Sequence, residues 1–201
     1  MQGKAITADE HAGDHGQDTT DVLGFWLYIM TDCVLFGTLF ATFIVLSNPG
    51  MHGPSLKPHI DLPYTLLETF CLLASNFTFC LATLDLHKNK MNKTLFWLLI
   101  TFLLGATFVG LEINEFYNVA KAGFRWDESG QASSFFTLVG THGLHVSIGL
   151  CWILLMMVQI PIMKINHVTK RRMTYLGLFW NFLDIVWIFL FTIVYLLGAL
   201  I

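Results

Sequence analysis

The sequence predicts an all-α integral membrane protein, a bundle of five transmembrane helices. Of its 201 residues, 55% are hydrophobic and only 12% are charged, whereas a soluble domain carries about 25% charged residues. Five apolar runs each reach the roughly 20 residues that a helix needs to cross a bilayer. The net charge of −3 and the lack of a basic, aromatic-rich stretch exclude the usual pattern of nucleic-acid binding.

The five helices are expected at residues 23–46, 64–86, 94–117, 133–163 and 173–201, within a membrane domain of residues 22–201. Residues 1–21 form a polar, acidic tail without the basic region and apolar core of a signal peptide. Pro63 begins the second span and Pro161 ends the fourth, where a missing N–H is tolerated. Because no span has a proline near its centre, the broken helices of secondary transporters are not indicated.

The cations of the connections predict the orientation. One side of the membrane carries Lys4, Lys88, Lys90, Lys93, Lys164, Lys170, Arg171 and Arg172, and the other carries Lys57, Lys121 and Arg125. Lys and Arg are enriched in cytoplasmic loops. We therefore expect a cytoplasmic N-terminus and a periplasmic C-terminus.

Polar side chains inside the spans are the candidate functional residues: Asp32, Glu68, Glu112, His142, His145, Asn181 and Asp184. Each ionisable group in hydrocarbon costs several kcal/mol unless it has a partner (~3 kcal/mol on insertion scales). Asp184 has two donors within one helical turn, Asn181 and Trp187, so we expect its carboxyl group to be either protonated or satisfied locally. Asp32 and Asp184 are at similar depth but isolated, so we expect roles in packing and assembly rather than in a proton relay.

Glu112 and His142 are expected to meet. They lie at similar depth on two antiparallel helices joined by a short connection. Small residues four apart, from Ala106 to Gly110 and from Gly143 to Ser147, would let these helices approach closely. Glu68, near one end of the second span, could reach the level of Glu112.

No metal site and no catalytic residue is expected in this chain. His142 and His145 are one turn apart and could supply two ligands, but only Glu112 is available as a third. Two histidines on one helix cannot hold a haem from opposite faces, and two are too few for a haem–copper centre. The sequence also lacks a nucleophile elbow and a Gly-rich phosphate loop.

Five motifs together resemble subunit III of the haem-copper terminal oxidases: Phe25 to Cys33, Leu67 to Phe70, Gly110 to Phe116, Gly140 to Val146 and Phe179 to Trp187. The resemblance runs from about Leu23 to the end. The five-span length looks like the short bacterial form, and the run from Leu138 to Val146 is most similar to the cytochrome bo-type ubiquinol oxidases.

The resemblance implies a non-catalytic subunit of a proton-pumping quinol:oxygen oxidoreductase in the bacterial inner membrane. Subunit I would carry the haems and copper, with subunit II and a small subunit IV as further partners beside membrane lipid. Asn181 stands where the family often has histidine. Two alternatives stay open: subunit III of a cytochrome c oxidase, and an autonomous proton or solute carrier that uses Asp32, Glu112, His142 and Asp184.

Overall fold

The computed structural model describes residues 8–47, 62–121, 130–163 and 165–196, and every regular element in these ranges is helical. The helices are α1 (Ala8–Leu46), α2 (Leu62–His87), α3 (Met91–Lys121), α4 (Gly130–Met163) and α5 (His167–Leu190), followed by a π-helical turn, η2 (Phe191–Leu196). All five α-helices contain a stretch long and apolar enough to span a membrane. The expected class and number of helices are confirmed.

The chain divides into two compact units, Met1–Leu35 and Phe36–Ile201. The first unit contains most of α1, whose apolar part begins at Val22. The helix itself begins at Ala8, so the polar stretch before the span continues the same helix. Backbone hydrogen bonds within the helix therefore extend beyond the segment that hydropathy alone marks.

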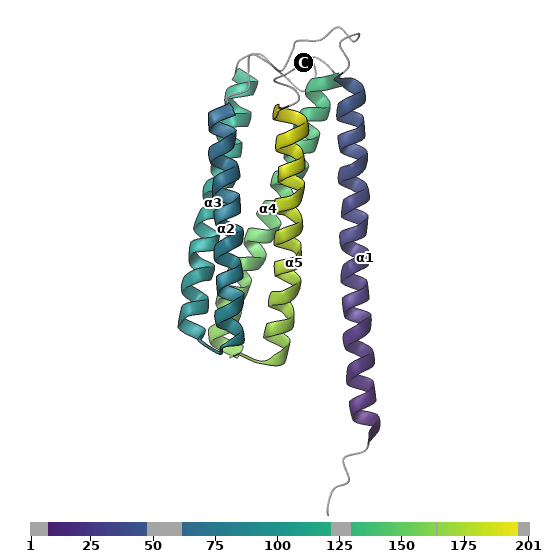
Figure 1. Cartoon of the computed structure of the whole chain (residues 1–201), viewed down its shortest axis with the longest axis vertical. Helices are drawn as coiled ribbons and strands as arrows, with labels where there is room; N and C mark the ends of the chain where they lie inside the picture. The colour runs from purple at the N-terminus through teal and green to yellow at the C-terminus, as the bar shows by residue number, and fades with distance from the viewer. Residues whose placement is uncertain (1–7, 48–61, 122–129, 164, 197–201) are drawn as a thin grey trace, which may run out of the picture. The chain divides into compact units, whose positions relative to one another are not determined.

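In the second unit α2 to α5 form a ring of four helices (Figure 1). Each packs on its neighbour in the chain, and α5 returns to pack on α2. The turn between α2 and α3 is closed by hydrogen bonds from Asn89 N–H to the Leu86 carbonyl and from Lys90 N–H to the Asp85 carbonyl. Asn89 has φ of 55°, the left-handed conformation that ends many helices and that asparagine tolerates.

Buried residues in the ring recur at alternating steps of three and four. Along α3 they are Thr94, Leu98, Thr101, Gly105, Phe108, Glu112, Glu115 and Val119. Along α5 the same steps run through Thr169, Met173, Leu176, Trp180, Leu183, Trp187 and Leu190, and Gly177, Phe179, Asp184 and Val186 beside them are buried too. This average repeat of 3.5 residues is the one that keeps a single stripe of a helix on its partners in a left-handed bundle. The stripe of α3 is largely small or polar, so the ring can pack closely.

Trp180 of α5 fills the centre of the ring and is almost completely buried. A Cβ added to Gly105 on α3 would lie 3.1 Å from its Cη2, and one added to Gly149 on α4 would lie 2.9 Å from its Cζ3. The indole Nε1 donates to Ser75 Oγ on α2 at 3.2 Å. One side chain therefore joins the three other helices.

The small-residue seam predicted between α3 and α4 is wrong for α3. Ala106 and Gly110 are both exposed, and a Cβ on Gly110 would meet nothing within 4 Å. The glycine that faces α4 is Gly105, where an added Cβ would lie 2.7 Å from Leu150 Cδ2. The prediction chose a common four-residue motif, whereas the 3.5-residue stripe selects the adjacent position.

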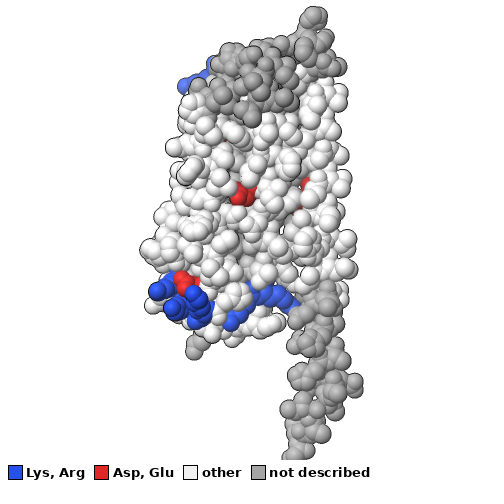
Figure 2. Space-filling view, in the orientation of Figure 1, with Lys and Arg blue, Asp and Glu red and all other residues white. Residues whose placement is uncertain are grey.

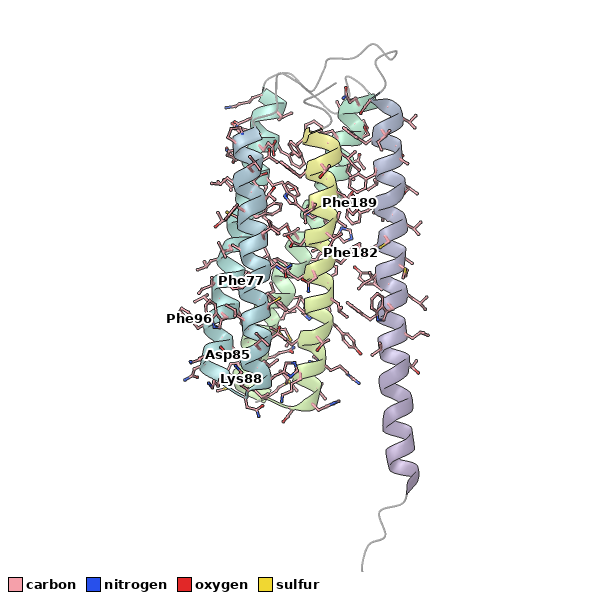
Figure 3. The ribbon with its side chains drawn as sticks, viewed as in Figure 1. Phe77, Asp85, Lys88, Phe96, Phe182 and Phe189 are labelled. Atoms are coloured by element: carbon pink, nitrogen blue, oxygen red, sulfur yellow. The ribbon has the colours of Figure 1, made fainter. Side chains whose placement is uncertain are left out.

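Large apolar side chains cover the outside of the ring. Phe77, Phe96 and Phe189, labelled in Figure 3, are all more than half exposed. Lys and Arg gather at one end of the ring, called here the basic end: Lys88, Lys90, Lys93, Lys170, Arg171 and Arg172 (Figure 2). An apolar wall with cations at its edge is the surface that a bilayer requires.

Replacing Gly105 with alanine should destabilise the ring, because the new methyl group would overlap Leu150 and crowd Trp180. We expect the free energy of unfolding to fall by roughly 1–3 kcal/mol, the usual cost of overpacking. Thermal unfolding of the full chain in mild detergent measures the loss. Gly110→Ala, on the same helix but in open space, is the matched control; equal effects of the two variants would contradict this description of the core.

Candidate functional site: polar groups inside the helix ring

The carboxyl group of Asp184 on α5 is bonded to α2 and not to residues of its own helix. Its Oδ2 accepts a hydrogen bond of 2.9 Å from Asn76 Nδ2 on α2. The two donors expected from its own helix are engaged elsewhere: Asn181 Nδ2 donates to the Gly177 carbonyl, and Trp187 Nε1 donates to Thr69 Oγ1. Asn181 is also exposed. The expected local satisfaction of Asp184 is therefore wrong, and its carboxylate joins α5 to α2.

His142 and His145 have different surroundings although they are one turn apart. The fully buried ring of His142 stacks on Trp187, with 5.3 Å between centroids and 28° between planes, and meets the edge of Phe108. Within the described residues, neither of its ring nitrogens has a hydrogen-bond partner. His145 Nδ1 lies 2.7 Å from the Thr141 carbonyl of its own helix. The two imidazoles therefore have different partners.

Glu112 reaches α4, but not through His142. A Cβ on Gly143 would lie 2.7 Å from Oε2 and 2.8 Å from Oε1 of Glu112. Among the described residues no hydrogen bond joins the carboxylate to the His142 ring. The depth prediction placed Glu112 at the correct level, but the absence of a side chain at residue 143 leaves the space that the carboxylate occupies.

Three acids lie inside the ring at the end opposite the basic end. Glu68 on α2 is fully buried and has electrostatic interactions with Glu112 and Glu115 of α3. Glu115 is buried and accepts a hydrogen bond of 3.0 Å from Tyr195 OH. Tyr195 lies on η2, where both Val194 and Tyr195 are fully buried. A π-turn adds a residue per turn and so brings both side chains inward.

Asp32 belongs to the first unit. It follows Thr31, whose hydroxyl donates to the Tyr28 carbonyl of the same helix at 2.7 Å. A packing or assembly role for Asp32 stays a prediction.

Hydroxyl groups complete the contacts between α2 and α3. Ser75 Oγ donates to the Thr101 carbonyl, and the hydroxyls of Thr78 and Thr101 lie 2.8 Å apart. Further along, Tyr64 OH donates to the Leu111 carbonyl. Sequence reasoning missed these residues because serine and threonine are common in membrane helices, but their 3.5-residue stripe could have identified them.

The polar groups mostly hold helices together. In the described part of the chain no three His, Cys, Asp or Glu side chains are placed to hold a metal ion. Hydrogen bonds between transmembrane helices contribute about 0.6 kcal/mol on average and up to about 1.7 kcal/mol. Together the bonds of Asn76, Ser75, Thr69 and Glu115 fix α2, α3 and α5, with η2, in one register.

Comparison with known proteins is consistent with this architecture. The family model of cytochrome c oxidase subunit III matches residues 3–199. Cytochrome bo(3) ubiquinol oxidase subunit 3 of Pseudomonas aeruginosa is 53% identical over 95% of this chain and 90% of that protein. The protein of the same name from Buchnera aphidicola is 43% identical over 89% and 92%. The probable quinol oxidase subunit 3 of Staphylococcus haemolyticus is 40% identical over 88% of each chain.

A double-mutant cycle tests the Asn76–Asp184 bond. Asn76→Ala and Asp184→Ala should show a coupling free energy of roughly 0.6–1.7 kcal/mol, the range measured for interhelical hydrogen bonds in membranes. Chemical or thermal unfolding of the four chains in detergent gives the values. The control cycle combines Asn181→Ala with Asp184→Ala and should be additive, because Asn181 bonds to Gly177. Coupling in the control cycle alone would restore the original expectation.

Proposed function

This chain belongs to the cytochrome c oxidase subunit III family, and on that premise we propose that it is the non-catalytic third subunit of a ubiquinol oxidase. Its role is to stabilise the catalytic subunit of a proton-pumping complex that passes electrons from quinol to oxygen. The relatives named as quinol oxidase subunits, at 40–53% identity over most of their length, support the choice of donor.

The observation that carries the stabilising role is how the interior is used. Trp180 fills the centre of the ring. The side-chain N–H groups of Asn76, Trp180 and Trp187 all donate hydrogen bonds to a neighbouring helix. The apolar residues outside the ring form a surface suited to another membrane subunit or to lipid (Figure 3). A bundle whose polar groups bond inward and whose outside is apolar suits the role of a scaffold.

Electron transfer is assigned to the partners. Subunit I would hold the haems and copper, subunit II would form part of the donor side, and a small subunit IV would complete the complex. In this chain His142 is enclosed by Phe108 and Trp187, and His145 is directed to a carbonyl of its own helix. Among the described residues, no three His, Cys, Asp or Glu side chains are grouped closely enough to hold a metal ion.

The basic end indicates the orientation in the bacterial inner membrane. Six cations, Lys88, Lys90, Lys93, Lys170, Arg171 and Arg172, lie at or near the α2–α3 turn and the start of α5, whereas Lys121 lies at the end of α3. The positive-inside rule places the basic end in the cytoplasm. Because five helices cross the membrane, the N-terminus then lies in the cytoplasm and the C-terminus in the periplasm.

Deleting the subunit tests the scaffold role. We expect the remaining complex to keep its haem absorbance but to lose quinol oxidase activity faster during turnover, because the catalytic subunit lacks its support. Oxygen uptake with quinol over repeated turnovers measures the lifetime, and restoring the wild-type chain is the control. An unchanged lifetime and assembly would contradict the proposal, and so would ion or solute flux from liposomes containing this chain alone.

Reporter fusions test the orientation. Alkaline phosphatase, which is active only outside the cytoplasm, should be active when fused after Ile201 and inactive when fused after Lys90. Green fluorescent protein at the same two positions should give the opposite pattern of fluorescence. The reverse result for both reporters would invert the proposed topology.

A further inference from the structure

A buried group of three acids lies at the end opposite the basic end, and of its members only Glu115 makes one of the interhelical hydrogen bonds described above. Its members, called here the acid cluster, are Glu68 of α2 and Glu112 and Glu115 of α3. They are 0%, 2% and 8% exposed, so all three are shielded from solvent by this chain. Glu68 interacts electrostatically with the two others, and Glu112 interacts with Glu115.

The partners of the three carboxyl groups are unequal. Glu115 Oε2 accepts the hydrogen bond from Tyr195 OH. Within the described ranges, neither oxygen of Glu68 and not Oε1 of Glu112 has a hydrogen-bond partner. An ionised carboxylate without donors is among the most costly groups to bury, whereas the neutral acid costs far less. Glu68 is thus the member for which a negative charge is least stable.

The other groups around the cluster do not supply a positive charge. His142 of α4 lies between Phe108 and Trp187, and Tyr195 of η2 is itself an acid. Tyr64 of α2 donates its hydroxyl hydrogen to the Leu111 carbonyl and accepts one from Asn114. Lys121 has its Nζ 4.4 Å from the centroid of the Tyr117 ring, and both residues are exposed.

We propose that the acid cluster is a proton-binding site, in which Glu68 holds a proton at neutral pH while Glu115, supported by Tyr195, carries the negative charge. A proton on Glu68 converts one of its two unpartnered carboxylate oxygens into a hydrogen-bond donor. It also removes one of the three negative charges that Glu68, Glu112 and Glu115 would otherwise carry. Like-charged carboxyl groups in one buried site cannot all ionise. A metal ion is a poorer occupant, since no three acidic or metal-binding side chains of the described residues are placed to hold one.

Infrared spectroscopy of the full chain in lipid nanodiscs tests the proposal, independently of whether the chain serves an oxidase. At neutral pH the wild type should show the C=O stretching band of a protonated carboxylic acid, and the band should shift in D2O. Glu68→Gln should lose this band and keep all carboxylate bands. Loss of a carboxylate band with the acid band unchanged would show that Glu68 is ionised and would overturn the proposal.

Asp85→Asn is the matched control. Asp85 lies on the same helix as Glu68 but at the basic end, near Lys88 (Figure 3). It should lose a carboxylate band and leave the acid band intact. If the acid band of the wild type disappears when sodium, potassium or calcium is added at constant pH, the cluster binds a cation instead, and the proposal is wrong.

Tyr195→Phe provides a second test if Glu68→Gln does not fold. Without the Tyr195 hydroxyl, the negative charge on Glu115 loses its donor, so the acid band at neutral pH should become stronger. A neutral phenylalanine fills nearly the same space, which keeps the packing. An acid band of unchanged intensity and frequency in Tyr195→Phe would contradict a proton shared among these groups.

Discussion

The packing of Trp180 among three helices is the contact on which the rest of the ring depends. Its indole occupies space that Gly105 and Gly149 leave free, and its N–H is bonded to Ser75. In lipid there is no hydrophobic gain from bringing two apolar helices together, so close packing and interhelical hydrogen bonds must supply the stability. Trp180 provides the close packing through Gly105 and Gly149, and the interhelical hydrogen bond through the hydroxyl of Ser75.

The same constraint explains why polar residues lie inside and aromatic residues outside. Hydroxyl and carboxyl groups facing lipid would be unsatisfied, whereas facing another helix they bond across it, as Asp184 does with Asn76 and Glu115 with Tyr195. Phe77, Phe96 and Phe189 are instead placed where the bilayer or a partner can contact them. A subunit built this way has a fixed outer surface, which suits a scaffold in an oxidase. In the acid cluster, both oxygens of Glu68 and Oε1 of Glu112 lack a hydrogen-bond partner among the described residues.

Much of the fold followed from the sequence, because hydropathy and helix length are local properties. The five spans and the family were predicted and are confirmed, although α5 begins at His167 and not at residue 173. The contacts between individual side chains were predicted less well than the helices. The predicted partners of Asp184 were wrong, and no hydrogen bond joins Glu112 to His142 among the described residues. Equal depth does not specify which face of a helix a residue occupies.

The sequence by itself determined that the chain crosses the membrane five times and which polar groups lie within the spans, since an apolar run of sufficient length has one stable environment. Only the tertiary structure decided which groups meet. A shift of one residue rotates a side chain by about 100° around a helix. That rotation separates exposed Ala106 from buried Gly105, and it places the carboxylate of Glu112 against Gly143 while the adjacent His142 stacks on Trp187.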